Sequence, residues 1–232
     1  NDPSLATMYK NGGLINTTLA SLQPGDTFVF PNTTYYIQGG IKASGLKAVT
    51  ISFDGTLVYN DDLKNWPRSG NGQKARVLEC MQFTNLENVT FTSSGMGLIN
   101  GKGAKWWGIP GIGYLVRQEN RPRLFTIESS KQILFENIIL KDSPYWTFWA
   151  PNVDGLEIRN SHIDVRRMGD DGHDIVDMTA FNTDGFDFTG KNIWIHDCVS
   201  TCCLFEGLVS FLLAPFSPTP FSSLFFRSLA FS

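Results

Sequence analysis

Two short stretches, QILFENI (residues 132–138) and GLEIRNS (residues 155–161), carry the pattern that decides the fold. Each stretch carries apolar residues two positions apart, and a polar Asn or Ser follows, which is typical of a β-strand that ends in a turn. Their leading apolar residues, Ile133 and Leu156, are 23 residues apart. The sequence therefore predicts a short structural unit that repeats along the chain.

Three further stretches repeat the pattern: VTISFDG from 49, NVTFTSSG from 88 and NIWIHDC from 192. The steps from 49 to 89, from 89 to 133 and from 156 to 193 are 40, 44 and 37 residues. These longer steps fit either two turns of a solenoid or one turn that carries an inserted loop. Repeats of this kind predict an all-β solenoid, a parallel β-helix. An antiparallel β-sandwich is the alternative, because it too has short strands and turn residues.

Two segments interrupt the repeats, 101–122 and 166–180, and such loops usually build the binding site on one face of a solenoid. Helical signals are scarce, and the best is a short one at 17–22.

The composition changes at residue 199. The tail 199–232 is rich in Phe and Ser, with Pro215, Pro218 and Pro220, and it does not continue the repeat. We therefore expect a β-helical domain at 1–198, truncated at its C-terminal side, and a non-matching apolar tail. Translated intron sequence is one interpretation of that tail, because Val199-Ser200 can be encoded by GTGAGT, a common splice donor.

The bulk composition describes a globular protein, with 42% hydrophobic and 18% charged residues. A net charge of −3 gives no attraction for nucleic acid or an anionic membrane, so we expect neither as a partner. Three N-x-S/T sequons, at Asn16, Asn32 and Asn88, favour a secreted protein of the extracellular space or cell wall. The chain begins at Asn1 without a visible signal peptide, so we expect a mature form or a fragment. Four cysteines permit two disulfides, whose pairing the sequence leaves open.

The stretch FNTDGFDFTG (181–190) carries the candidate chemistry. In a parallel β-helix the residue one coil later lies roughly 4.8 Å above, so a second carboxylate one coil after Asp184 would face it across a sugar bond. Glycoside hydrolysis needs such a pair. The alternative is an Asx turn that only ends a strand.

The run TAFNTDGFDFTGKNIWIHDC (179–198) resembles the first catalytic motif of the polygalacturonases, glycoside hydrolase family twenty-eight. INGKGAKWW, RPRLF, LFENIILKDSPYWTFWA and NVDGLEIRNSHID are also similar to that family, in its order and spacing. The resemblance covers roughly residues 20–198. It implies a right-handed parallel β-helix and inverting hydrolysis of α-1,4-galacturonan in pectic polysaccharide. It also implies a catalytic Asp184 supported by Asn182, with no cofactor, and we expect a monomer at full length.

The departures from the family matter equally. The family continues with an Asp-Asp pair, a Gly-His-Gly and an Arg-x-Lys, but the chain reads LFEGL at 204–208, where Glu206 is the only acid. We therefore expect weak or no activity from this chain.

Two other groups of residues are candidates for binding. Among the aromatic residues Trp106, Trp107, Tyr145, Trp146 and Trp149, we expect Tyr145 and Trp146 to contact substrate, although packing is the alternative for each. The acids Asp170, Asp171, Asp174 and Asp177, with His173, could form a hard-ligand metal site. Their spacing fits no EF-hand loop and His is not a usual calcium ligand, so we expect a solvated, charged insertion and no metal.

Two further functions stay open. A pectate lyase would use the same fold with calcium, and it would give an unsaturated product. A non-catalytic β-helix that binds carbohydrate or acts as a scaffold would explain the missing second motif.

Overall fold

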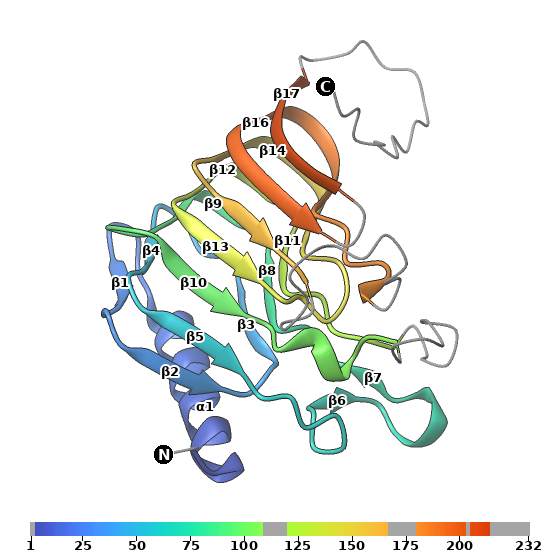
Figure 1. The fold of residues 1–232 in the computed structure, drawn as a ribbon. Coiled ribbons are helices and arrows are strands. Elements are labelled where there is room, and N and C mark those ends of the chain that lie inside the picture. Colours follow the sequence, from blue (N-terminus) through green and yellow to red (C-terminus); the bar gives the residue numbers. More distant parts are fainter. Residues whose placement is uncertain (1–2, 109–119, 167–179, 203–204, 214–232) are drawn as a thin grey trace.

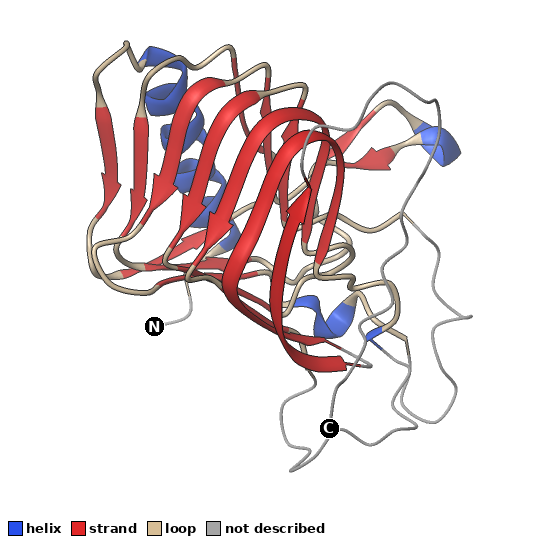
Figure 2. Ribbon diagram, turned by 90° about the horizontal axis from the view of Figure 1, so that it is seen from above, coloured by secondary structure: helices blue, strands red, loops and turns tan. Residues whose placement is uncertain are grey.

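The computed structural model describes residues 3–108, 120–166, 180–202 and 205–213, and side chains throughout except at Gln73, Cys202 and 205–213. These residues form a parallel β-helix closed at one end by a helix (Figure 1). Neighbouring strands of successive coils pair in parallel, which confirms the solenoid prediction and excludes the antiparallel sandwich. Figure 2 shows the coils layered from one end of the molecule to the other.

Three stacks of parallel strands form the walls. Stack A contains β3 (Ile41–Ser44), β8 (Met81–Thr84), β11 (Phe125–Glu128) and the first parts of β14 (Phe148–Arg159) and β16 (Phe186–Cys202). Stack B contains β1 (Thr27–Phe30), β4 (Thr50–Phe53), β9 (Glu87–Thr92), β12 (Lys131–Glu136) and the second parts of β14 and β16. Stack C contains β2 (Thr34–Ile37), β5 (Thr56–Tyr59), β10 (Gly97–Asn100), β13 (Ile138–Lys141), β15 (His162–Asp164) and the end of β16.

The register of stack B decides what the longer repeat steps mean. Val89 pairs with Ile133, Ile133 with Leu156, and Leu156 with Ile193. Steps of different length therefore each span one coil, and the longer ones carry an inserted loop.

The described ends of the insertions all lie at one corner of the helix, between stack C and stack A. Residues 60–80, 101–124, 142–147 and 165–185 each leave a stack C strand and return to a stack A strand. The first contains the hairpin β6 (Arg68–Ser69) and β7 (Arg76–Val77) with the 3₁₀ helix η1 (Gly72–Lys74), and the second contains η2 (Gly103–Lys105). The shared corner agrees with the expectation that loops gather on one face.

Aromatic side chains fill the interior. Phe125 lies parallel to Phe148 with ring centroids 5.7 Å apart, and it meets Phe91 and Phe135 edge-on. These residues are fully buried, and they repeat at matching positions of successive coils. Stacked aromatic rings therefore tie each coil to the next.

The N-terminal helix is longer than the sequence predicts. Helix α1 spans Leu5–Ser21, whereas the pattern indicated only 17–22. Gly, Thr and Asn are weak helix formers, so local propensity underestimates it. Its stability comes from packing, because Met8, Ile15 and Leu19 are buried along one face against the end of the coil stack. Ser4 caps the helix by accepting a hydrogen bond from the Thr7 backbone N–H at 3.2 Å.

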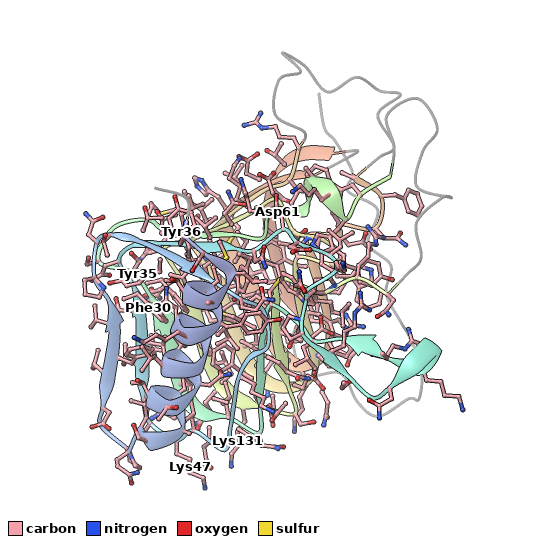
Figure 3. All side chains as sticks on the ribbon, turned by 90° about the horizontal axis from the view of Figure 1, so that it is seen from below. Phe30, Tyr35, Tyr36, Lys47, Asp61 and Lys131 are labelled. Carbon is pink, nitrogen blue, oxygen red and sulfur yellow. The ribbon has the colours of Figure 1, made fainter. Side chains whose placement is uncertain are left out.

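A row of alternating charges follows the turn between stacks A and B: Lys47, Glu87, Lys131, Asp154 and Lys191. The Nζ atoms of Lys47 and Lys131 contact Glu87 at 3.1 and 3.0 Å. Figure 3 shows both lysines at one edge of the molecule, far from Asp61. The row lies in register with the coils, one charge to each.

The last described strand leaves the parallel arrangement. Strand β17 (Phe205–Leu213) pairs antiparallel with β16, and Glu206 lies opposite Thr201. Glu206 therefore does not occupy a parallel position one coil after Asp184.

Candidate active site

The turn that carries Asp184 lies at the corner where the insertions gather. Thr183 is fully buried, and its hydroxyl donates to the Ala180 carbonyl at 2.7 Å. The Asp184 carbonyl accepts from the Thr147 N–H of the preceding coil at 2.8 Å. Asn182 adopts a left-handed backbone with φ of 54°. The turn is thus held to the neighbouring coil, with the Asp184 side chain half-buried rather than sealed in the core.

A second carboxyl group lies beside Asp184 in the same coil. Asp187, at the start of β16, is in register with Trp149 on stack A. Burial and, to a smaller extent, the nearby Asp184 carboxylate raise its pKa to about 7, although Arg123 opposes the shift. Burial also raises the pKa of Asp184, and Arg121 opposes it. Burial thus favours the protonated form of both acids, and the Asp184 carboxylate adds to this effect at Asp187.

Two arginines and three aromatic residues form a stack next to the two acids. The Arg121 guanidinium lies over the Tyr145 ring at 4.6 Å, and Tyr145 stacks on Trp146 at 5.0 Å with 13° between the ring planes. Arg123 lies over Trp146 at 4.7 Å and over Trp149 at 3.9 Å. These contacts fix both cations in place.

Each arginine is also held by hydrogen bonds. Arg121 is 6% exposed, and its Nη1 donates to the carbonyls of Pro144 and Phe181 at 3.1 and 3.0 Å. Arg123 Nη1 contacts Glu79 Oε1 at 2.7 Å, and the Arg123 backbone N–H donates to Glu79 Oε2. Arg121 therefore joins the Asp184 turn to the loop before β14.

The structure thus brings Asp184, Asn182, Tyr145 and Trp146 to the same corner. The rings of Tyr145 and Trp146 are half-buried and stack on each other and on the arginines. Their roles as substrate contacts stay predictions. Trp106 and Trp107 are 3% and 1% exposed, which agrees with the packing alternative for these two.

The sequence reasoning missed Asp187, Arg121, Arg123 and Glu79. The spacing Arg-x-Arg before a strand was a usable signal, because residues two apart share one face of an extended chain. Nothing local indicated that both arginines would meet the aromatic side chains of the next coil.

The candidate metal ligands belong to the acid-rich insertion, 166–180. Asp170, Asp171, His173, Asp174 and Asp177 lie outside the described residues. Within the described parts, no three His, Cys, Asp or Glu side chains are grouped as metal ligands.

The three sequons differ in their surroundings. Asn32 and Asn88 are exposed, Asn32 in the turn between β1 and β2 and Asn88 near the start of β9. The Asn16 side-chain amide instead donates to the Gly40 carbonyl at 3.0 Å and accepts from the Lys42 N–H at 2.8 Å. Glycosylation of all three stays a prediction. The two hydrogen bonds of Asn16 make glycosylation less favourable at that site.

The structure describes the side chains of two of the four cysteines. Cys80 and Cys198 are buried free thiols, so neither closes a disulfide.

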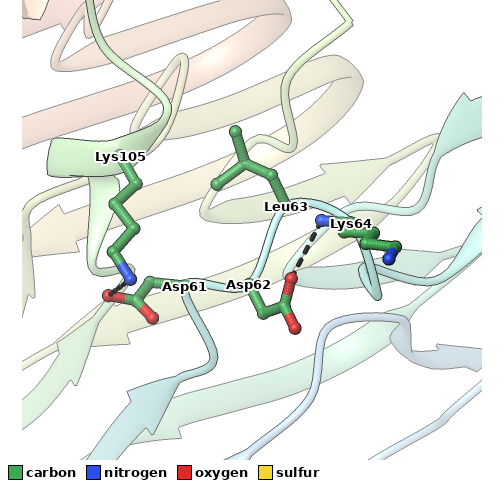
Figure 4. A pocket seen from close by; sticks show the side chains of 5 residues that line it. All are labelled: Asp61, Asp62, Leu63, Lys64 and Lys105. Carbon is green, nitrogen blue, oxygen red and sulfur yellow. Dashed lines mark hydrogen bonds and ion pairs between the residues drawn. The ribbon is translucent and has the colours of Figure 1, made fainter.

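A separate concavity opens near the first insertion. It is lined by Asp61, Asp62, Leu63, Lys64 and Lys105 (Figure 4). Lys105 pairs with Asp61 at 3.1 Å, and Asp62 accepts from the Lys64 N–H at 3.0 Å. Neither Asp184 nor Asp187 lines it.

In the described parts of the chain, no helix has the length and apolar character needed to cross a bilayer.

Comparison with known proteins places the site in a family. An α-L-rhamnosidase of Aspergillus niger is 24% identical over 170 residues, covering 72% of this chain and 37% of the relative. A polygalacturonase of Chamaecyparis obtusa is 26% identical over 156 residues, covering 65% of this chain and 26% of the relative. The crystal structure of an endo-xylogalacturonan hydrolase from Aspergillus tubingensis superposes with a TM-score of 0.65 at 22% identity, covering 82% of this chain and 47% of that one.

The chain thus spans half or less of the length of these proteins. The family model for glycosyl hydrolases family 28 matches residues 26–201, which contain every strand of the parallel stacks and both acids. This match covers most of the chain, and the likeness in fold agrees with it. The chain belongs to glycosyl hydrolases family 28.

Proposed function

We propose that this chain contributes to the hydrolysis of glycosidic bonds in pectic polysaccharide, with Asp184 as a catalytic carboxylate. The observation that carries the proposal is the acid pair of Asp184 and Asp187, half-buried beside two fixed arginines at the corner where all insertions gather. Glycoside hydrolysis requires carboxyl groups in different protonation states, and the unequal surroundings of these two supply them.

The finer proposal is a polygalacturonase-type reaction, inverting hydrolysis of α-1,4-galacturonan. Asn182, Tyr145 and Trp146 are the proposed substrate contacts. The relatives carry three different substrate names, so family membership supports the pectic class more strongly than the individual linkage. We further propose a secreted protein of the extracellular space or cell wall that is monomeric at full length.

The proposed rate is low. No Asp-Asp pair, Gly-His-Gly or Arg-x-Lys follows Asp184 in this sequence. Removal of one positioned acid costs about 10²–10⁴ in rate.

The test compares the natural chain with Asp184→Asn on polygalacturonate, rhamnogalacturonan and xylogalacturonan, with new reducing ends and bound polysaccharide measured separately. We expect slow release of reducing ends from one of these substrates. Asp184→Asn should lower that rate by about 10²-fold or more while binding persists. Asp197→Asn, an exposed acid on the opposite part of β16, is the matched control.

Each other outcome has a definite meaning. Binding without reducing ends from the natural chain would replace hydrolysis by the non-catalytic carbohydrate-binding function. A calcium-dependent, ultraviolet-absorbing product would indicate a lyase. Equal rates for the natural chain and Asp184→Asn would remove Asp184 from the reaction.

A further inference from the structure

The ion pair between Glu79 and Arg123 is held unusually firmly for a pair at the rim of a site. Its side chains are only 17% and 22% exposed, and Glu79 receives both the guanidinium and the backbone N–H of Arg123. The guanidinium also lies over the rings of Trp149 and Trp146. A cation fixed on both sides in this way cannot turn toward a passing ligand without losing several contacts.

Asp187 lies next to this cation. It is the register neighbour of Trp149, whose ring carries Arg123. Its Oδ2 is shielded from solvent and has no hydrogen-bond partner among the described side chains. Burial of an unpartnered carboxylate oxygen is costly, so the group gains by keeping a proton.

Two charged groups act on Asp187 directly, and three more act indirectly, through other charged groups. Asp184 faces it from the preceding turn, and Arg123 faces it from the segment before β11. Arg121 acts on Asp184 rather than on Asp187. Glu79, before β8, neutralises Arg123, and Glu128 of β11 interacts with Glu79. Glu79 therefore influences Asp187 through the cation that it holds.

We propose that Glu79 is a positioning residue of the candidate active site, which holds the Arg123 guanidinium and offsets its attraction for the Asp187 carboxyl group. Arg123 alone would favour an ionised Asp187, and Glu79 cancels much of that attraction. The inference rests on the proposed function only for its biological meaning, because the protonation of Asp187 is a property of the free protein.

The pair predicts two shifts of opposite sign. Glu79→Gln keeps the shape and the acceptor oxygen of Glu79 but leaves Arg123 uncompensated, so Asp187 should ionise at lower pH, by roughly one unit. Arg123→Gln removes the attracting cation, so Asp187 should ionise at higher pH. A purely structural role of the pair would not give opposite directions.

The experiment follows the ¹³C carboxyl resonance of Asp187 by NMR as a function of pH in the full chain without substrate. Glu87→Gln and Arg159→Gln are the matched controls, because both break ion pairs on other parts of the coil and should leave the midpoint unchanged. The double variant Glu79→Gln/Arg123→Gln leaves neither partner charged, and its midpoint should lie above that of Glu79→Gln. This double variant keeps the test available if Arg123→Gln does not fold.

An unchanged midpoint in Glu79→Gln would overturn the proposal. A double variant whose midpoint moves further in the same direction as that of Glu79→Gln would also overturn it. The result is independent of hydrolysis. Opposite shifts without cleavage of any pectic polysaccharide would reject the proposed function alone, whereas cleavage with an unmoved midpoint would reject this inference alone.

Discussion

Asp187 links the protonation of one side chain to the stability of the fold. Its pKa is about 7 in the folded chain because it is buried, against an ordinary value of 3.8. The unfolded chain therefore releases this proton near pH 4, whereas the folded chain keeps it until about pH 7. The contribution of this group to stability falls as pH rises between these values and is constant above them.

From this we expect the free energy of unfolding of Asp187→Asn, relative to that of the natural chain, to increase by roughly 3–4 kcal/mol as the pH rises from 4 to 7. Urea unfolding at pH 4, 5.5, 7 and 8 measures it. Asp154→Asn is the control with the opposite sign, because Asn192 and Lys191 lower the pKa of Asp154 and stabilise its charged form. Parallel stability curves for the natural chain and Asp187→Asn would contradict the expectation.

The two acids differ in how far the sequence could identify them. Asp184 was found because NTDGFDF resembles a motif, and its half-buried position agrees with a functional group. Asp187 lies three residues later in the same stretch. Its raised pKa arises from burial under other coils, and no local pattern contains that information.

Among the elements, helix α1 packs on the coil stack and is also hydrogen-bonded through Asn16 to the start of β3. The Asn16 amide satisfies the Gly40 carbonyl and the Lys42 N–H at once, at 3.0 and 2.8 Å. Each intramolecular hydrogen bond of this kind contributes about 0.5–1.5 kcal/mol net, and Asn16 makes two.

Asn16→Ala should therefore lower the free energy of unfolding by about 1–3 kcal/mol. Asn32→Ala, at an exposed turn and in another sequon, should change it by less than about 0.5 kcal/mol. Chemical denaturation of the unglycosylated chain measures both. Equal effects would mean that the Asn16 contacts do not anchor the helix.

The helix also shows where a local pattern is insufficient. Its weak propensity indicated only 17–22, yet packing of one apolar face on the coil stack extends it over Leu5–Ser21.

At the scale of the whole molecule, the coils approach so closely that some positions exclude any side chain. A Cβ atom at Gly97 would lie 1.9 Å from the carbonyl oxygen of Phe53, which belongs to the preceding coil. A backbone oxygen cannot move away without shifting the strand that contains it, so the spacing of two coils depends on this glycine.

We expect Gly97→Ala to destabilise the fold by about 3 kcal/mol or more. Gly95→Ala is a close control, because a Cβ there would meet nothing within 4 Å. Thermal melting followed by circular dichroism compares the two. Similar melting temperatures for both variants would show that the coils can separate locally.

The sequence by itself determined the strands, their parallel coiling, the interrupting loops and Asp184. Those properties follow from alternation of apolar and polar residues and from a motif, which act over a few neighbouring positions. Only the tertiary structure decided that each step from 23 to 44 residues is one coil, that all insertions share a corner and that β17 turns back. The tertiary structure alone also brought Arg123 next to Glu79 and Asp187. Those contacts depend on the register between coils, which is set by the loop lengths and is not encoded in any single segment.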